Sequence, residues 1–183
     1  IVVSQSWVDA KFGTVANGLL LLAVVYSFAS HGPLSFQREY SDAIRQRLPA
    51  SQDIPTIREA DLAPLLRLVQ GYLRAAGVVG KPQVRSMRLR FVGRIRSAAD
   101  APWMPFVAEQ HSFFDSTTRL FWMRASRGGI PFDVLHRFAD RAATMRVRVA
   151  SLLPMVDAKG PDMTRAETVT LLNDMVAMAP ATL

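Results

Sequence analysis

The spacing of hydrophobic and polar positions changes several times along the chain, and the first pattern is a continuous apolar run. From Phe12 to Gln37 there is no formally charged residue, and Gly13 to Ser30 is almost entirely apolar. A helix of about 20 residues crosses the hydrocarbon core of a bilayer. The run therefore predicts a transmembrane helix over residues 13–30, within a membrane segment of residues 1–30.

Two other interpretations of this run stay open. A secretory signal peptide normally carries a basic region in front of its apolar part. Here Asp9 and Lys11 stand in front, and a further apolar stretch, Ile1 to Val3, precedes them. A buried helix of a soluble protein is the second alternative, because a run of this length that contains Asn17 is short for a span.

The next segment, residues 31–60, has helical periodicity followed by a linker. Phe36, Tyr40, Ile44 and Leu48 recur at steps of four with polar residues between them, which predicts an amphipathic helix. The composition of Pro49 to Pro55 is typical of an exposed hinge.

This amphipathic helix has two possible roles. It could lie on a membrane surface, where three cations would meet anionic lipid: Arg38, Arg45 and Arg47. It could equally be a connector that packs on its own domain. The same arginines follow the predicted span, whereas only Lys11 precedes it, so the positive-inside rule predicts that the rest of the chain is cytoplasmic.

From residue 61 the pattern predicts a soluble domain, residues 61–183. A helix is expected from Asp61 to Ala76, with Pro64 in its first turn. Alternation with a period of two then predicts strands, which we expect at residues 84–96, 103–113, 119–126, 132–140 and 144–152. After a turn at residues 157–162, Thr164 and Glu167 have the spacing of a capping box that opens a final helix.

The separators between these strands are short, so consecutive strands should be antiparallel. The expected fold class is α+β: an N-terminal transmembrane helix, then an antiparallel meander of about five strands flanked by helices. Such a curved meander is compatible with an incomplete half-barrel. Open sheet edges are usually covered or paired, so we expect the domain to be incomplete at its C-terminus.

Composition excludes several classes of protein. The chain of 183 residues has no cysteine, which removes disulfide frameworks, thiolate nucleophiles and iron-sulfur clusters. The net charge of +7 raises the question of nucleic acid. Alternation places Phe91 on the face opposite Arg88 and Arg90, so cations and aromatic ring would not form one platform, and nucleic acid is not expected.

The residues with catalytic potential are few. Glu109 and His111 would share one face of a strand, where a carboxylate can tune a histidine as a base. One histidine with two acids, counting Asp115, matches no spaced metal or hydrolase motif. We therefore expect no metal and no cofactor, and we keep a polar strand face as the alternative to catalysis.

The apolar positions of the domain are large and rich in methionine, which suits irregular hydrophobic ligands. The candidate ligand-binding residues are Phe91, Trp103, Phe106, Phe121, Trp122 and Met175. The alternative is an ordinary core, because aromatic and methionine side chains at regular spacing usually pack against each other.

Two parts of the chain resemble known bacterial sequences. Ser4-Gln5 and the stretch from Trp7 to Asn17 resemble the loop before the last span of DoxX-like multi-span membrane segments. From Asp61 onward the chain is similar to a soluble bacterial domain of unknown function, on short motifs at residues 69–74, 103–110, 153–161 and 171–183. The resemblance implies that the domain is cytoplasmic. It also implies that this chain is an internal fragment of a longer protein, with further spans upstream and further strands downstream. It brings no known activity and no catalytic residue.

Together these observations predict a protein of the bacterial inner membrane whose cytoplasmic domain binds a hydrophobic or anionic-lipid ligand without chemistry of its own. Its expected partners are membrane lipid and other membrane-protein subunits. A structural subunit of a membrane complex and a hydrolase that uses Glu109 and His111 are the alternatives.

Overall fold

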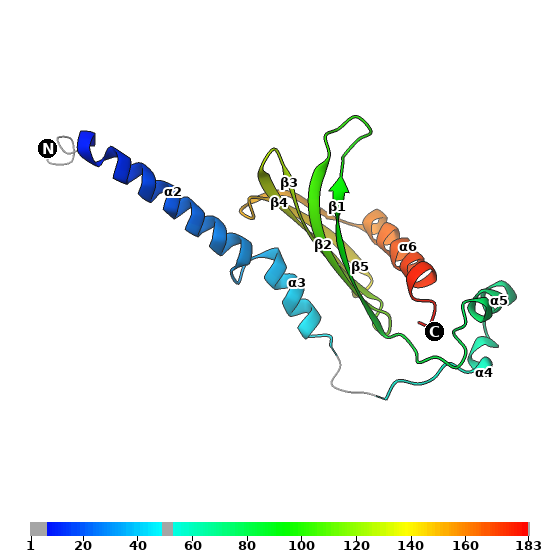
Figure 1. Cartoon of the computed structure of the whole chain (residues 1–183). Helices are drawn as coiled ribbons and strands as arrows, with labels where there is room; N and C mark the ends of the chain where they lie inside the picture. Colours follow the sequence, from blue (N-terminus) through cyan, green and yellow to red (C-terminus); the bar gives the residue numbers. More distant parts are fainter. Residues whose placement is uncertain (1–6, 49–52, 183) are drawn as a thin grey trace.

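The computed structural model is an α+β fold in which one antiparallel sheet lies between two helices (Figure 1). It describes residues 7–48 and 53–182, without the side chains of residues 7–10 and 12. The apolar stretch at residues 1–3, Ser4-Gln5, the part of the predicted linker at residues 49–52, and Leu183 lie outside the described residues.

The elements follow one another in the predicted order, with one more strand and with the helix expected from Asp61 to Ala76 divided in two. The helices are α2 (Trp7–His31), α3 (Phe36–Arg45), α4 (Glu59–Leu62), α5 (Arg67–Ala75) and α6 (Pro161–Met178). The strands are β1 (Ser86–Ile95), β2 (Met104–Phe113), β3 (Thr118–Arg127), β4 (Ile130–Ala139), β5 (Ala142–Val149) and β6 (Leu153–Lys159). The sheet order is β1-β2-β3-β4-β5-β6, an open meander that does not close into a barrel.

Three tight turns join the last four strands, and each has positive φ at two successive residues. The pairs are Gly128-Gly129, Asp140-Arg141 and Ala150-Ser151. Two-residue hairpins favour turns with this conformation because their twist matches that of the strands. The first two turns lie at short separators that the sequence predicted between strands. The third was not, because Ala and Ser carry no turn signal of this kind.

The expected strand over residues 144–152 is therefore wrong at its end, because the chain reverses at Ala150-Ser151 and continues as β6. A bulge between Val147 and Arg148 shifts the register of the β5–β6 pair. Part of the turn expected at residues 157–162 also belongs to β6. The sheet has six strands in place of about five.

Two helix boundaries also differ from the prediction. The expected helix from Asp61 to Ala76 is two helices, α4 and α5. Pro64 has no N–H to donate to the Ala60 carbonyl, so α4 ends before it. Helix α6 begins at Pro161, so Thr164 is inside it. Thr164 Oγ1 accepts a hydrogen bond from Ala143 N at 3.1 Å, and no capping box forms.

Helix α3 packs on one face of the sheet. Phe36 and Tyr40 are 3% exposed and form a cluster with sheet residues Phe113, Leu120 and Trp122. The apolar side of the predicted amphipathic helix is thus used within the domain, so α3 is a connector packed on its own domain.

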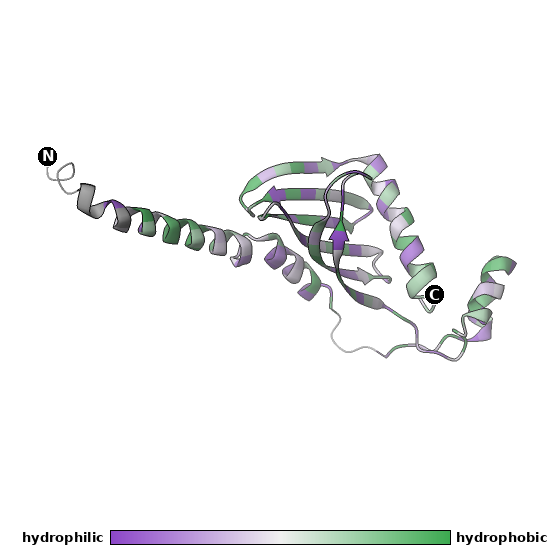
Figure 2. Ribbon diagram, turned by 45° about the horizontal axis from the view of Figure 1, so that its top comes forward, coloured by the Kyte–Doolittle hydropathy of each residue, from purple (hydrophilic) through white to green (hydrophobic). Residues whose placement is uncertain are grey.

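Helix α2 projects away from the sheet (Figure 1), and the residues in its middle are hydrophobic (Figure 2). Leu19 to Leu22 are each more than 60% exposed. Within the described residues, this is the one helical stretch long and apolar enough to cross a membrane, and only 6% of its most apolar window is buried. The helix is therefore not packed into the core formed by the described residues.

The cluster beneath α3 should carry much of the stability of the domain. Leu120 is 1% exposed, and Leu120→Ala should lower the free energy of unfolding by about 2–5 kcal/mol because it leaves a cavity. Val92→Ala is the control: Val92 lies on the same face and is 75% exposed, so the change should stay within about 0.5 kcal/mol. Chemical denaturation in detergent, followed by tryptophan fluorescence, measures both. Equal losses in the two variants would contradict this packing.

Candidate functional site: an apolar sheet face closed at one end by ion pairs

The face of the sheet opposite α3 carries a continuous apolar row. Six residues lie side by side across the six strands, one on each: Phe91, Ala108, Met123, Val134, Val147 and Val156. Side chains that are directly paired in an antiparallel sheet lie on one face. We call this surface, together with its half-buried neighbours Phe106, Phe121, Phe132 and Met145, the apolar face.

Small residues set the shape of the apolar face. Ala108 and Ala125 are fully or almost fully buried beneath their larger neighbours. Gly93 lies directly across from Phe106, and a Cβ at this glycine would come within 3.3 Å of the Phe106 ring. The ring therefore packs close to the backbone of β1 at this glycine. Met123 and Val134, in the middle of the row, are only 9% and 6% exposed, whereas Phe91 at the β1 edge is 36% exposed.

Aromatic contacts extend the apolar face towards α6. The rings of Phe91 and Phe121 are 6.4 Å apart, and Phe121 meets His136 edge-on at 5.9 Å. The guanidinium of Arg119 lies 5.5 Å from the Phe121 ring. The apolar surface thus passes directly into a polar cluster.

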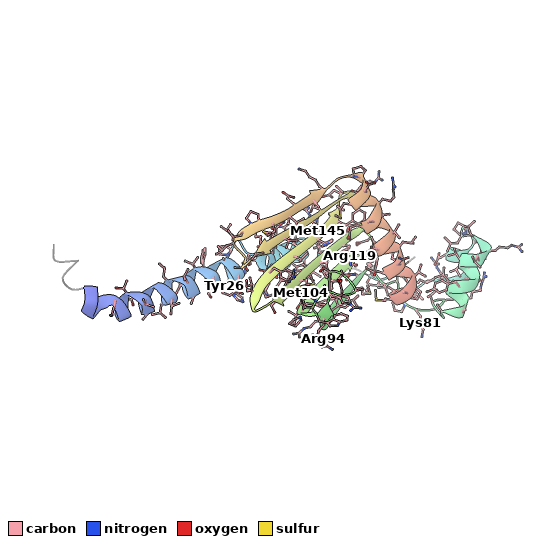
Figure 3. All side chains as sticks on the ribbon, turned by 90° about the horizontal axis from the view of Figure 1, so that it is seen from above. Tyr26, Lys81, Arg94, Met104, Arg119 and Met145 are labelled. Atoms are coloured by element: carbon pink, nitrogen blue, oxygen red, sulfur yellow. The ribbon has the colours of Figure 1, made fainter. Side chains whose placement is uncertain are left out.

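That polar cluster is an ion-pair network between the sheet and α6. Arg119 donates to Glu167 at 2.8 Å and to Asp174 at 3.2 Å, both on α6. It also donates to Gln110 Oε1 at 2.8 Å, and the Gln110 amide donates to Asp174 at 2.6 Å. The three charged side chains are between 8% and 13% exposed. Figure 3 labels Arg119 on the sheet beside α6.

His136 completes the network through Glu167, at 3.1 Å between Nδ1 and the carboxylate. Burial raises the pKa of Glu167, but the hydrogen bonds and charges of His136 and Arg119 outweigh it, so that its pKa lies below the usual value. Glu167 is therefore a carboxylate at neutral pH. It links α6 to the sheet through its ion pair with Arg119 and its hydrogen bond with His136.

The sequence did not reveal this network, although two signals for it exist. Arg119 interrupts an otherwise apolar alternation with Phe121 and Met123. On α6, Glu167 and Asp174 fall on the same side of the helix as Leu171, which is 3% exposed. Charges placed on an apolar side of an element are usually paired when buried. The capping-box interpretation of Glu167 hid the second signal.

The six candidate ligand residues do not form one site. Phe91, Phe106 and Phe121 belong to the apolar face. Trp122 lies on the opposite face, 6% exposed in the cluster beneath α3. The other two lie apart as well.

Trp103 precedes β2, is 53% exposed, and lies under the guanidinium of Arg96 at 4.6 Å. Met175 is on α6 and packs against the cluster of Phe138, Ala143 and Leu171. It also lines a groove of about 320 Å³ between α5 and α6. Neither side chain takes part in the apolar row.

Glu109 and His111 share the α3 face, as the alternation predicted, but they do not act on each other. The Glu109 carboxylate accepts from Arg88 at 2.8 Å. His111 is 8% exposed and stacks on Phe113 at 4.4 Å, and neither of its ring nitrogens has a hydrogen-bond partner among the described residues. Burial, with the charge of Arg88, lowers the pKa of His111. Nothing in this geometry activates a nucleophile.

Among the described residues, no group of three or more metal-ligating side chains comes together. The three arginines expected at a membrane surface divide into two kinds. Arg38 and Arg45 both pair with Asp42 on α3, the first at 3.4 Å. Arg47 instead lines a groove beside the end of α2.

The fold and this face define a class: an α+β domain with a partly accessible apolar sheet face, attached to an exposed apolar helix. The chain belongs to DUF6544, a family of unknown function, which matches residues 55–183. Neither the comparison with curated proteins nor the comparison with solved structures gives a match.

The ion-pair network gives a direct test of how α6 is held. Arg119→Met leaves two buried carboxylates without their cation and should lower the free energy of unfolding by about 3–5 kcal/mol. Arg165→Met removes an arginine that is 79% exposed on the same helix and should change it by less than about 0.5 kcal/mol.

A further variant separates charge from packing. Adding Glu167→Gln and Asp174→Asn to Arg119→Met should recover part of the loss, because the uncompensated charges are gone. Chemical denaturation in detergent measures all three variants. A single Arg119→Met variant as stable as Arg165→Met would show that the network does not hold α6.

Proposed function

We propose that this protein is a membrane-anchored binding module whose apolar face takes up a hydrophobic ligand and which carries out no chemistry itself. The single observation that carries the proposal is the apolar row across all six strands, with its large side chains partly open at the β1 edge. A soluble domain usually covers such a face, because exposed apolar surface is costly.

The composition of the apolar face favours a flexible aliphatic ligand. Met123 and Met145 have unbranched, polarizable side chains that adapt to irregular shapes. Phe91, Phe106 and Phe121 supply broad apolar surface beside them. Arg119 is paired with carboxylates of the protein itself, at one end of the apolar face. A ligand on this face therefore needs no charged group to pair with Arg119. A fatty acyl chain is the ligand class that fits this surface.

Membrane anchoring is the second part of the proposal. A helix whose leucines are this exposed is stable when lipid or a partner surrounds it. The flanking arginines favour a cytoplasmic position of the domain by the positive-inside rule. The resemblance of residues 4–17 to DoxX-like bacterial segments supports placement of α2 as a last span in the inner membrane.

A second candidate function is that of a structural subunit, and one observation favours it. Strand β6 is an open edge, and three of its apolar side chains are exposed: Leu153 at 63%, Met155 at 65% and Val156 at 38%. Another chain could add a strand there. Stoichiometric protein retained in native mass spectrometry of detergent-extracted material would favour this candidate over the lipid-binding one.

Neighbouring residues of β1 allow a matched test of ligand binding. Phe91→Asp puts a carboxylate on the apolar face and should weaken binding of a fluorescent fatty acid by roughly tenfold or more, because burying a charge in apolar surroundings is costly. Val92→Asp introduces the same charge one residue away on the opposite face and should bind as the unaltered chain does. Fluorescence titration in a mild detergent measures both. Equal binding by the two variants would refute the site.

The topology is tested with single cysteines, since the chain has none. In bacterial cells, a membrane-impermeant maleimide should label Arg165→Cys only after the membrane is permeabilised. Ser4→Cys, before the span, should react in intact cells. Labelling of Arg165→Cys in intact cells would contradict the cytoplasmic placement of the domain.

A further inference from the structure

A second surface, distinct from the apolar face, lies where α2 meets the domain. It is a groove of about 730 Å³ between the end of α2, helix α3 and the β5–β6 turn. Three arginines from different parts of the fold line it: Arg47 just after α3, Arg137 on β4 and Arg148 on β5. We call it the arginine groove.

The arginines are held in place by the domain but keep donors to spare. Arg148 donates to Leu34 O at 3.0 Å and lies 4.2 Å over the Phe36 ring. Arg47 donates to Ala43 O at 3.2 Å, and Arg137 lies 3.6 Å from Asp140. Each of these contacts engages one nitrogen of a guanidinium that has five N–H donors.

The acidic residues at the groove are already neutralised by other arginines. Glu39 pairs with Arg146 on β5. Asp42 pairs with both Arg38 and Arg45 on α3. These three cations do not line the groove. Of its own arginines, Arg137 has Asp140 beside it, so Arg47 and Arg148 carry the uncompensated positive charge. A forked guanidinium is the group best suited to bind phosphate through two hydrogen bonds.

The rim of the arginine groove is apolar and exposed. Phe28 near the end of α2 is 60% exposed, Leu34 is 76% exposed and Leu152 in the β5–β6 turn is 48% exposed. Figure 1 shows α3 and the sheet beside this end of α2. If α2 spans the bilayer, this end of the helix would lie at the headgroup layer. Apolar side chains would then meet acyl chains beside arginines that meet phosphates.

We propose that the arginine groove binds the phosphate of an anionic phospholipid in the leaflet where α2 emerges. This inference rests on one part of the proposed function, that α2 spans the membrane, and is independent of ligand binding at the apolar face. The bound headgroup would orient the domain on the membrane surface, because the groove combines contacts from α2, α3 and the sheet.

The test uses the full chain reconstituted in nanodiscs that contain equal amounts of phosphatidylglycerol and phosphatidylcholine with the same acyl chains. Native mass spectrometry after partial removal of lipid counts the headgroups that stay bound. The chain should retain phosphatidylglycerol in preference to phosphatidylcholine by roughly tenfold, the effect expected from a few arginines at an anionic surface.

Matched variants separate the groove from general charge. Arg137→Gln with Arg148→Gln should abolish the preference, and tryptophan fluorescence checks that this variant is folded. Because Arg148 also packs on Phe36, the variants Arg137→Gln and Arg47→Gln are measured singly, and each should reduce the preference. Arg165→Gln removes the same charge from α6, on the other side of the sheet, and should leave it unchanged.

Three results of the lipid-binding measurement would overturn the inference. One is an unaltered chain without headgroup preference, and another is an equal loss in Arg165→Gln, which would indicate general electrostatic attraction. The third is loss of the preference in excess inorganic phosphate, which would make a soluble phosphate the ligand. Phe91→Asp should keep the preference even where fatty-acid binding is lost, so the two proposals fail separately. A chain that does not enter nanodiscs would refute the membrane anchor and this inference together.

Discussion

Arg119 attaches α6 to the sheet, and this interaction decides which part of the sheet is covered. One guanidinium on β3 meets two carboxylates of α6, Glu167 and Asp174, with all three side chains nearly buried. Buried charges are tolerated only when they are paired and hydrogen-bonded. The network therefore fixes where α6 can lie, and so which part of the sheet it covers and which part stays accessible.

The two faces of the sheet consequently have different roles. On one face, α3 packs over Leu120 and Trp122. On the same face, Arg124 connects the sheet to α2, because it donates hydrogen bonds to Asp133 at 2.7 Å and to the Ser30 carbonyl at 3.1 Å. That face is structural and connects the domain to the apolar helix. On the other face, α6 covers only one end. The remaining apolar row is the surface that we propose binds a hydrophobic ligand.

This arrangement gives the proposed binding module a consistent geometry. The exposed apolar helix, the arginine groove at its end and the apolar face lie in order from the proposed membrane outward into the domain. Each uses a different physical interaction: burial of leucines in lipid, charge-assisted hydrogen bonds to phosphate, and apolar contact with an acyl chain. The catalytic alternative has no comparable support, because the carboxylate of Glu109 is bound to Arg88 and His111 is enclosed beside Phe113.

The sequence by itself determined the features that depend on neighbouring residues. The uncharged run of residues 13–30, the four-residue steps of α3 and the alternation of β1 follow from local periodicity, which reports which side of an element is apolar. Alternation also placed Phe91 opposite Arg88 and put Glu109 and His111 on one face. It could not find the turn at Ala150-Ser151, whose positive φ values are imposed by pairing of β5 with β6.

Only the tertiary structure decided which apolar residues act together. Trp122 and Phe121 are adjacent in sequence, yet one is buried beneath α3 and the other belongs to the apolar face. Arg119 lies 48 positions from Glu167 and 55 positions from Asp174 in the sequence, and it meets them only when α6 folds back on the sheet. Arg47, Arg137 and Arg148 likewise come together from different parts of the fold. Periodicity carries no information about such distant pairings, because they depend on the register of the strands and on where a helix is held.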